Sequence, residues 1–184
     1  MIDILGDLRG GLAVSCQAAE DSRLHQTHHI VAFARAAIMD GAKDVRIAGI
    51  ADFADVCGSV TVPVIGITKI AQAATDVYIT PSLSDVRKLC EAGADIVAFD
   101  ATKRPRPSSV PELIAEIRWA GRIVMADIST LDEAAEAMDA RADFVGTTPS
   151  GYAPYSAQVT SPDFVLMREL SSAWIPLRLR RADL

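Results

Sequence analysis

The sequence predicts an α/β fold in which parallel strands alternate with helices and curl into part of a barrel. Six short runs rich in Val, Ile or Ala recur along the chain, each too short for a lone helix. Between them, apolar residues recur at helical spacing, and Gly-Ala or Ala-Asp steps lead several helices into the next strand. This alternation is typical of crossover units. About six of the eight units of a TIM-type (β/α)8 barrel are present, which predicts an incomplete barrel.

The predicted elements follow one another in a single domain that spans residues 1–184. Strands are predicted at residues 12–17, 45–49, 62–69, 95–102, 123–129 and 144–148. Helices are predicted between them at 30–40, 84–92, 110–120 and 131–140, with a further one after the last strand at 162–173. Residues 77–81 follow the third strand too closely for a full unit, so we expect a short extended stretch there. Residues 174–184 form an atypical tail that fits no unit.

Composition and charge indicate the class of partner. Half of the residues are hydrophobic, which is ample for a buried core, and the net charge is -6. A nucleic-acid surface needs a basic face, so a small molecule is the expected partner. No apolar stretch approaches the ~20 residues of a membrane span, and the start Met1-Ile2-Asp3 lacks the basic character of a secretory signal. We therefore expect a cytoplasmic protein with no membrane partner.

The cysteines are odd in number and have no metal-ligand spacing. Cys16, Cys57 and Cys90 are far apart in the chain. We expect free thiols in a reducing compartment and no bound metal.

A lysine ends the third predicted strand. Lys69 follows five uncharged residues, Val64-Ile65-Gly66-Ile67-Thr68, so its side chain would project from the mouth of the barrel. A desolvated lysine there has a lowered pKa and can act as a base. The alternative is a surface lysine that simply closes a strand.

Three further charged residues lie in or after predicted strands. Arg46 stands between β-branched residues, and a buried arginine needs an anionic partner, which is either a ligand or a nearby carboxylate such as Asp44 or Asp52. Asp127 ends the fifth run, and it either orients substrate hydroxyls and a basic lysine or helps to begin the next helix. The same two roles are open for Asp100.

Taken together and in order, several strings resemble one enzyme family, the N-acetylmannosamine-6-phosphate 2-epimerases. These strings are Gly-Leu-Ala-Val-Ser-Cys-Gln at 11–17, Gly-Ile-Thr-Lys at 66–69, Asp-Ala-Thr-Lys-Arg-Pro-Arg-Pro at 100–107 and Gly-Thr-Thr-Pro-Ser-Gly-Tyr at 146–152. The resemblance extends from about residue 10 to about residue 172. The Arg-Pro-Arg-Pro and Ser-Gly-Tyr strings are not shared with other phosphosugar barrels such as indole-glycerol-phosphate synthase relatives.

The resemblance implies an isomerase of sialic acid and amino-sugar catabolism that inverts C2 of N-acetylmannosamine 6-phosphate and gives N-acetylglucosamine 6-phosphate. Removal of the C2 hydrogen beside the C1 aldehyde gives an enolate, which requires a base and a group that stabilises the oxyanion. The family's catalytic lysine corresponds to Lys69, and Gln17, Arg46 and Asp127 match positions that line the sugar. The family uses no cofactor and no metal, and its members are often homodimers.

The chain also departs from the family pattern. Ala48, Ile70 and Ile128 stand where the family commonly has polar residues or cysteine. The family continues with two strands that supply a catalytic glutamate and much of the phosphate site, whereas only Ile175-Pro176 resembles the start of the first of them. The alternative to an active epimerase is therefore a truncated remnant without catalysis, which serves at most as a sugar-binding or interaction module.

Overall fold

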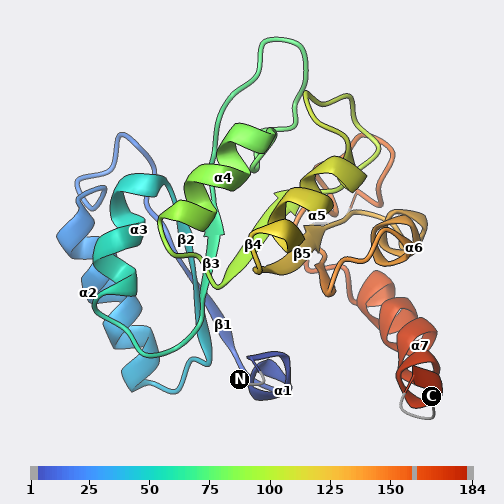
Figure 1. Ribbon diagram of the computed structural model, residues 1–184, viewed down its shortest axis with the longest axis horizontal. Helices are drawn as coiled ribbons and strands as arrows, with labels where there is room; N and C mark the ends of the chain where they lie inside the picture. Colours follow the sequence, from blue (N-terminus) through green and yellow to red (C-terminus); the bar gives the residue numbers. More distant parts are fainter. Residues whose placement is uncertain (1–3, 159–160, 182–184) are drawn as a thin grey trace.

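The computed structural model describes residues 4–158 and 161–181, in which helices and strands alternate (Figure 1). The strands are β1 (Ala13–Cys16), β2 (Asp44–Ala48), β3 (Val64–Ile67), β4 (Ile96–Asp100), β5 (Ile123–Asp127) and β6 (Phe144–Gly146). The helices are α1 (Ile4–Leu8), α2 (Thr27–Met39), α3 (Ile50–Cys57), α4 (Leu83–Glu91), α5 (Val110–Trp119), α6 (Leu131–Asp139) and α7 (Phe164–Arg181).

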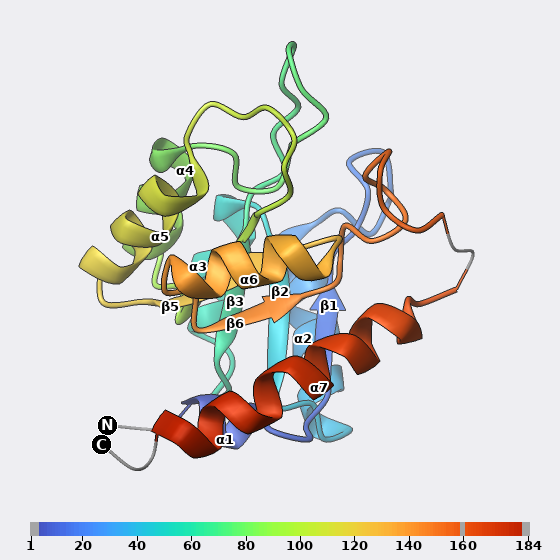
Figure 2. The same ribbon diagram turned by 90° about the vertical axis from the view of Figure 1, so that its right-hand side faces the viewer.

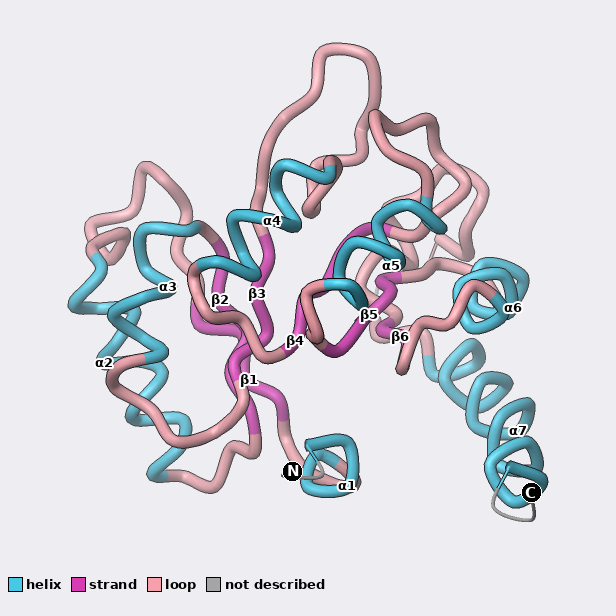
Figure 3. The backbone as a smooth tube through the Cα atoms, in the orientation of Figure 1, coloured by secondary structure: helices cyan, strands magenta, loops and turns pink. Residues whose placement is uncertain are grey.

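The six strands form one parallel sheet in the order β1-β2-β3-β4-β5-β6. The sheet curls, and helices α2 to α6 lie around its outer side (Figure 3). Each strand is hydrogen-bonded to the next one along the chain, as right-handed crossover units require. The prediction of an incomplete barrel with six units is confirmed.

Side chains alternate between the two faces of each strand and form two apolar clusters. Val45 and Ile47 of β2, with Val97 and Phe99 of β4, belong to the larger cluster, which packs the sheet against its helices. The smaller cluster lies inside the curl and contains Ile65, Ile67, Ile96, Ala98 and Ile79, with Ile4 and Leu8 of α1 packed against it. Charged side chains on the same inner face of the strands therefore lie next to this smaller apolar cluster.

Aspartates fix the register of the sheet where strands begin. Asp95 stands before β4, and its Oδ2 accepts a hydrogen bond from the backbone N–H of Val64, the first residue of β3 (3.0 Å). Asp143 stands before β6 and accepts one from Val124 of β5 in the same way (2.8 Å). Each carboxylate thus accepts a hydrogen bond from a backbone N–H near the start of the neighbouring strand.

The turns that follow the helices use left-handed backbone. Gly41, Gly93 and Gly121 have positive φ angles of 97°, 100° and 70°. This conformation suits glycine because it has no Cβ. After α6 the equivalent position is held by Arg141 at φ 75°, a strained conformation for a residue with a side chain.

The loops that follow β1, β3, β4 and β6 gather at one end of the sheet (Figure 2). The stretch predicted to be extended at 77–81 is so only in part, because Thr80 has a left-handed φ of 45°. Ile79 bridges Lys69 in antiparallel fashion, and the Asp100 N–H donates to the Ile79 carbonyl (3.1 Å). This stretch therefore folds back over the carboxyl ends of β3 and β4, beside the inner face.

Some predicted boundaries were wrong. Helices α1 and α3 were not predicted, because α1 is a single short turn and α3 is packed into a brief connection between two strands. Five of the six strands are shorter than predicted, since polar residues such as Lys69 and Ser129 lie beyond the last ladder pairing, and β2 is shifted by one residue. Residues 174–181 do not enter the sheet but continue α7 as helix, in keeping with the high helix propensity of Leu and Arg. Residues 182–184 lie outside the described part of the chain.

No helix in the described part of the chain is both long and apolar enough to cross a membrane.

Candidate active site

Strand register places four predicted site residues on the inner face of the curl. Ser15 of β1 pairs with Arg46 of β2, so Gln17, two residues farther on, shares their parity. Lys69 follows the inner residues Ile65 and Ile67 at the same spacing of two. Asp127 follows Met125, which packs against the inner cluster. Four separate strands therefore direct polar side chains toward the same mouth.

Arg46 and Asp127 form an ion pair inside the curl. Arg46 Nη2 donates to Asp127 Oδ2 (2.5 Å) and Nη1 donates to Oδ1 (3.2 Å). The aspartate side chain is fully buried, and the arginine side chain is 11% exposed. A bidentate guanidinium–carboxylate pair has a defined orientation. Each group also compensates the charge of the other, which would be costly to bury alone. Arg46 therefore pairs with Asp127 and not with Asp44, whereas the side chain of Asp52 lies outside the described part of the structure; Arg46 keeps further N–H donors for a ligand.

Asp127 does not begin the next helix. The cap of α6 is Thr130, whose hydroxyl accepts the Glu133 N–H while the Glu133 carboxylate accepts the Thr130 N–H. The Asp127 side chain instead lies on the inner face of the curl, where it binds Arg46. Its Oδ1 accepts a second hydrogen bond from the Thr148 hydroxyl, which lies two residues after β6 (3.2 Å).

Lys69 lies at the mouth, two residues after β3. The residue as a whole is exposed. Partial burial lowers the pKa of its ammonium, and the positive charge of nearby Arg46 lowers it further. A lowered pKa increases the neutral fraction of the amine, which is the form that accepts a proton. The exposure of Lys69 keeps this effect moderate.

Gln17 presents an amide oxygen that has no hydrogen-bond partner among the described residues. Its Nε2 donates to the Ser15 hydroxyl (2.5 Å), which orients the amide, and its buried Oε1 is unpaired. A buried acceptor without a partner is costly. An N–H or O–H group of a ligand would satisfy it.

Asp100 does not join this group but belongs to a separate network. It is buried, and its carboxylate accepts hydrogen bonds from the Thr102 hydroxyl (2.6 Å) and from Arg104 (2.5 Å). Arg106 also contacts Asp100, and it donates to the backbone carbonyls of Asp100 and Thr102. The Arg-Pro-Arg-Pro string therefore ties the loop after β4 to the end of that strand.

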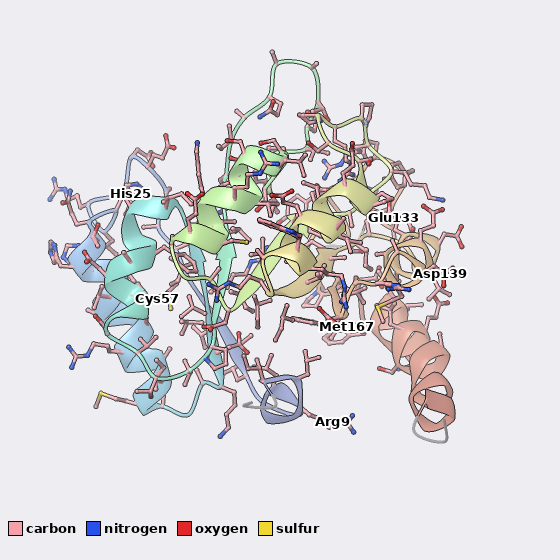
Figure 4. The ribbon with its side chains drawn as sticks, viewed as in Figure 1. Arg9, His25, Cys57, Glu133, Asp139 and Met167 are labelled. Atoms are coloured by element: carbon pink, nitrogen blue, oxygen red, sulfur yellow. The ribbon has the colours of Figure 1, made fainter. Side chains whose placement is uncertain are left out.

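Sequence reasoning recognised the helix start near Glu133 but missed that this carboxylate joins three loops. Glu133 on α6 (Figure 4) is 1% exposed. It accepts from Ser129 and Thr130 in its own loop, from the Lys103 N–H in the loop after β4 (2.8 Å), and from the Tyr155 hydroxyl in the loop after β6 (2.6 Å). Burial raises the pKa of Glu133, but these hydrogen bonds outweigh burial and hold it below its usual value. No sequence signal points to Tyr155.

The loop after β6 carries a polar hollow beside this site. A cavity of about 600 Å³ opens there. It is lined by Thr147, Thr148, Ser150, Gly151, Tyr152, Ser161, Pro162 and Asp163. Thr148, which lines this hollow, also donates to Asp127 and so links the hollow to the inner polar group. Another hollow of about 230 Å³ lies on the outer side, between α4 and α5, away from the carboxyl ends of the strands.

Within the described ranges, no group of three or more His, Cys, Asp or Glu side chains could hold a metal ion. Cys16, Cys57 and Cys90 are free thiols, and burial raises the pKa of each. A thiol with a raised pKa is a poor nucleophile at neutral pH. The polar group at the mouth therefore offers amine, guanidinium, carboxylate and amide chemistry, which suits proton transfer on a polar organic ligand.

Comparisons with known proteins identify the family to which the chain is similar. A family model described as "Putative N-acetylmannosamine-6-phosphate epimerase" matches residues 30–179. The chain is 48% identical over 169 residues to the bifunctional enzyme NanE/NanK of Brucella melitensis, covering 92% of the chain and 33% of that relative. It is 42% identical to a putative N-acetylmannosamine-6-phosphate 2-epimerase of Clostridioides difficile, covering 91% of the chain and 76% of the relative.

A solved structure is also similar. The N-acetylmannosamine-6-phosphate 2-epimerase from Clostridium perfringens superposes with a TM-score of 0.89 at 40% sequence identity, covering 92% of this chain and 75% of that one. The chain thus spans about a third of the bifunctional relative and about three quarters of the single epimerases. The family resemblance drawn from the sequence strings is confirmed.

Proposed function

The chain belongs to the N-acetylmannosamine-6-phosphate epimerase family, and we propose that it interconverts N-acetylmannosamine 6-phosphate and N-acetylglucosamine 6-phosphate. The observation that carries this proposal is the gathering of Lys69, Arg46 and Asp127 on one inner face at the strand ends. Family membership supports the phosphosugar substrate, and the geometry supports proton transfer at a carbon beside a carbonyl.

Lys69 is the proposed base. In the open-chain sugar, the C2 hydrogen lies beside the C1 aldehyde and is acidic for that reason. The neutral amine of Lys69 takes this proton and becomes an ammonium. The C2–H electron pair forms the C1–C2 double bond of an enolate, and the negative charge moves to the C1 oxygen. The lowered pKa of Lys69 supports this role, because only the neutral amine can accept the proton.

Arg46, Gln17 and Asp127 are proposed to hold the sugar. The N–H donors of Arg46 that Asp127 does not use suit the developing oxyanion. The unpaired Oε1 of Gln17 suits a hydroxyl or an amide N–H of the substrate. Epimerisation is complete when a water molecule gives a proton to C2 on the opposite face and the enolate electron pair forms the new C–H bond. The Lys69 ammonium then gives its proton to the hydroxide that remains, which restores the neutral amine and a water molecule.

The test is a solvent-exchange assay on the purified chain. N-Acetylmannosamine 6-phosphate is incubated with the protein in D2O, and NMR follows both the loss of the C2 proton and the appearance of N-acetylglucosamine 6-phosphate. We expect exchange and product with the wild-type chain, and neither with Lys69→Met. Lys88→Met, at an exposed lysine on α4, is the matched control and should behave like wild type.

The assay also separates the two functions that the sequence left open. Tight binding of the phosphosugar by folded protein, without any deuterium at C2, would favour a sugar-binding module and overturn the epimerase proposal. Exchange that survives Lys69→Met would leave the activity in place but refute Lys69 as the base.

A further inference from the structure

Asp127 is a buried carboxylate whose two oxygens are both in use. Oδ2 accepts only from Arg46 among the hydrogen bonds of the described residues, whereas Oδ1 accepts from both Arg46 and Thr148, each at 3.2 Å. A carboxylate on a buried strand needs donors on all sides, because it is cut off from water. Thr148 supplies the donor that does not come from the ion pair.

The approach of β6 to Asp127 depends on the lack of a side chain at Gly146. Gly146 pairs with Asp127 in the sheet register. A Cβ atom at Gly146 would stand 2.8 Å from Asp127 Oδ1 and 2.5 Å from Met125 Cε. Such contacts are far closer than van der Waals distance, so a side chain here would displace the carboxylate or the strand. Because Gly146 has no side chain, β6 can lie close to Asp127, and the Thr148 hydroxyl, two residues farther on, can donate to its carboxylate.

The segment that carries Thr148 is held from its other side. Seven residues farther on, Tyr155 donates its hydroxyl to Glu133 (2.6 Å) and accepts the Lys103 N–H (2.7 Å). Ser150 donates to Asp163, at the start of α7 (2.8 Å). The loop after β6 is thus fixed at several points between Asp127 and α7.

We propose that Thr148 is a positioning residue that holds the Asp127 carboxylate in the orientation that aims Arg46 at the ligand. An ionised carboxylate can only accept, so the Thr148 hydroxyl must donate its single hydrogen to Asp127. The lone pairs of the hydroxyl oxygen then remain for a ligand. The site consequently selects a substrate with an O–H or amide N–H donor beside this threonine, as an N-acylated sugar provides.

The kinetic part of this inference rests on the proposed epimerase function, whereas its structural part does not. The structural part is tested by NMR of the arginine guanidinium groups, with the Arg46 signals assigned from Arg46→Lys. In the wild-type chain, the bidentate pair should give sharp and separate Nη–H resonances. Thr148→Val keeps the shape of the side chain but removes the donor, and it should broaden these resonances. Thr148→Ser keeps the donor and should restore them.

The kinetic part compares the same variants in the exchange assay. Loss of a hydrogen bond to a charged group that orients a binding residue should raise KM about tenfold for Thr148→Val, with a smaller effect on kcat. A purely structural defect would reduce the amount of folded enzyme and leave KM unchanged. Thr148→Ser should have a KM close to wild type. Thr61→Val, at an exposed threonine before β3, is the control for loss of a surface hydroxyl.

The outcomes separate this inference from the proposed function. If Thr148→Val leaves the Arg46 resonances sharp, or if Thr148→Ser behaves like Thr148→Val, the positioning role is refuted. If the wild-type chain shows no exchange at all, the proposed function fails, and the NMR comparison alone decides the role of Thr148. Thr148→Ala provides a second variant without the hydroxyl in case the valine variant does not fold.

Discussion

Arg46 and Asp127 are joined by two hydrogen bonds although their strands, β2 and β5, are separated in the sheet by β3 and β4. The pair therefore spans the inside of the curl instead of linking neighbouring strands. It holds two regions of the sheet at a fixed distance and directs a guanidinium toward the mouth, near Lys69. We therefore expect both the stability of the fold and the proposed chemistry to depend on this one contact.

Arg46→Met should lower the free energy of unfolding by about 3–5 kcal/mol, because it leaves Asp127 buried and uncompensated. Urea denaturation measures this change. Arg87→Met breaks an exposed pair with Glu116, in which the arginine side chain is 58% exposed, and should cost at most about 1 kcal/mol. The double variant Arg46→Met/Asp127→Leu should recover most of the loss. Equal effects of Arg46→Met and Arg87→Met would contradict this account.

The pKa of Lys69 should lie below its ordinary value of 10.5 in the wild-type chain. Because the charge of Arg46 contributes to the lowering, the Arg46→Met/Asp127→Leu variant should raise it. NMR titration of the Lys69 side chain, assigned with Lys69→Arg, gives both values without requiring activity. A Lys69 pKa that is the same in both proteins would show that Arg46 does not act on the lysine.

Stability should fall as the pH rises from about 4 to about 6 because of Asp44. Burial raises the pKa of Asp44 from 3.8 to about 6, and its Oδ1 has no hydrogen-bond partner among the described residues. The folded state thus binds this proton more tightly than the unfolded state does. The resulting stabilisation is complete below about pH 4 and is lost as the pH rises through about 6.

Asp44→Asn should therefore make the protein more stable than wild type above pH 6, by about 2 kcal/mol, and should have little effect at pH 4. Urea denaturation at pH 5 and pH 8 measures the difference. Asp21→Asn removes the same charge at an exposed site and is the control. A wild-type protein that loses no more stability between these pH values than Asp44→Asn would refute the assignment.

Arg141→Gly should stabilise the fold by about 1 kcal/mol, because it relieves a left-handed conformation in a residue with a side chain. The reverse change at the equivalent turn, Gly93→Ala, should destabilise by about 1–2 kcal/mol. A Cβ at Gly93 would meet no atom within 4 Å, so the cost there comes from the backbone alone. Thermal unfolding of the two variants should show shifts of opposite sign.

Much of the fold could be predicted because it depends on local patterns. Runs of β-branched residues, helical spacing and the Gly-Ala steps each carry their own signal, and together they predicted all six strands in order. Helix α3 was missed because Ile50–Cys57 is short and its pattern merges with the preceding strand. Its N-cap is Gly49, which has no side chain that could cap the helix.

The site could be predicted only in part, because a sequence shows which residues end strands but not which of them meet. Strand ends and the family resemblance predicted that Lys69, Arg46 and Asp127 belong to one site, and the register of the sheet then placed them on one face. The partner of Arg46 could not be chosen from sequence, since Asp44 and Asp52 are nearer in the chain than Asp127. Thr148 and Tyr155 were missed because their roles arise from loop conformation, which leaves no periodic signal.

Asp95 and Asp143 hold the sheet together at the end remote from the mouth. Because these two hydrogen bonds fix the register of the strands at that end, the loops at the opposite end should tolerate insertion, deletion or exchange without a shift of any strand. Engineering of this fold for a different ligand should therefore keep Asp95 and Asp143 and change only the loops that follow the carboxyl ends of the strands.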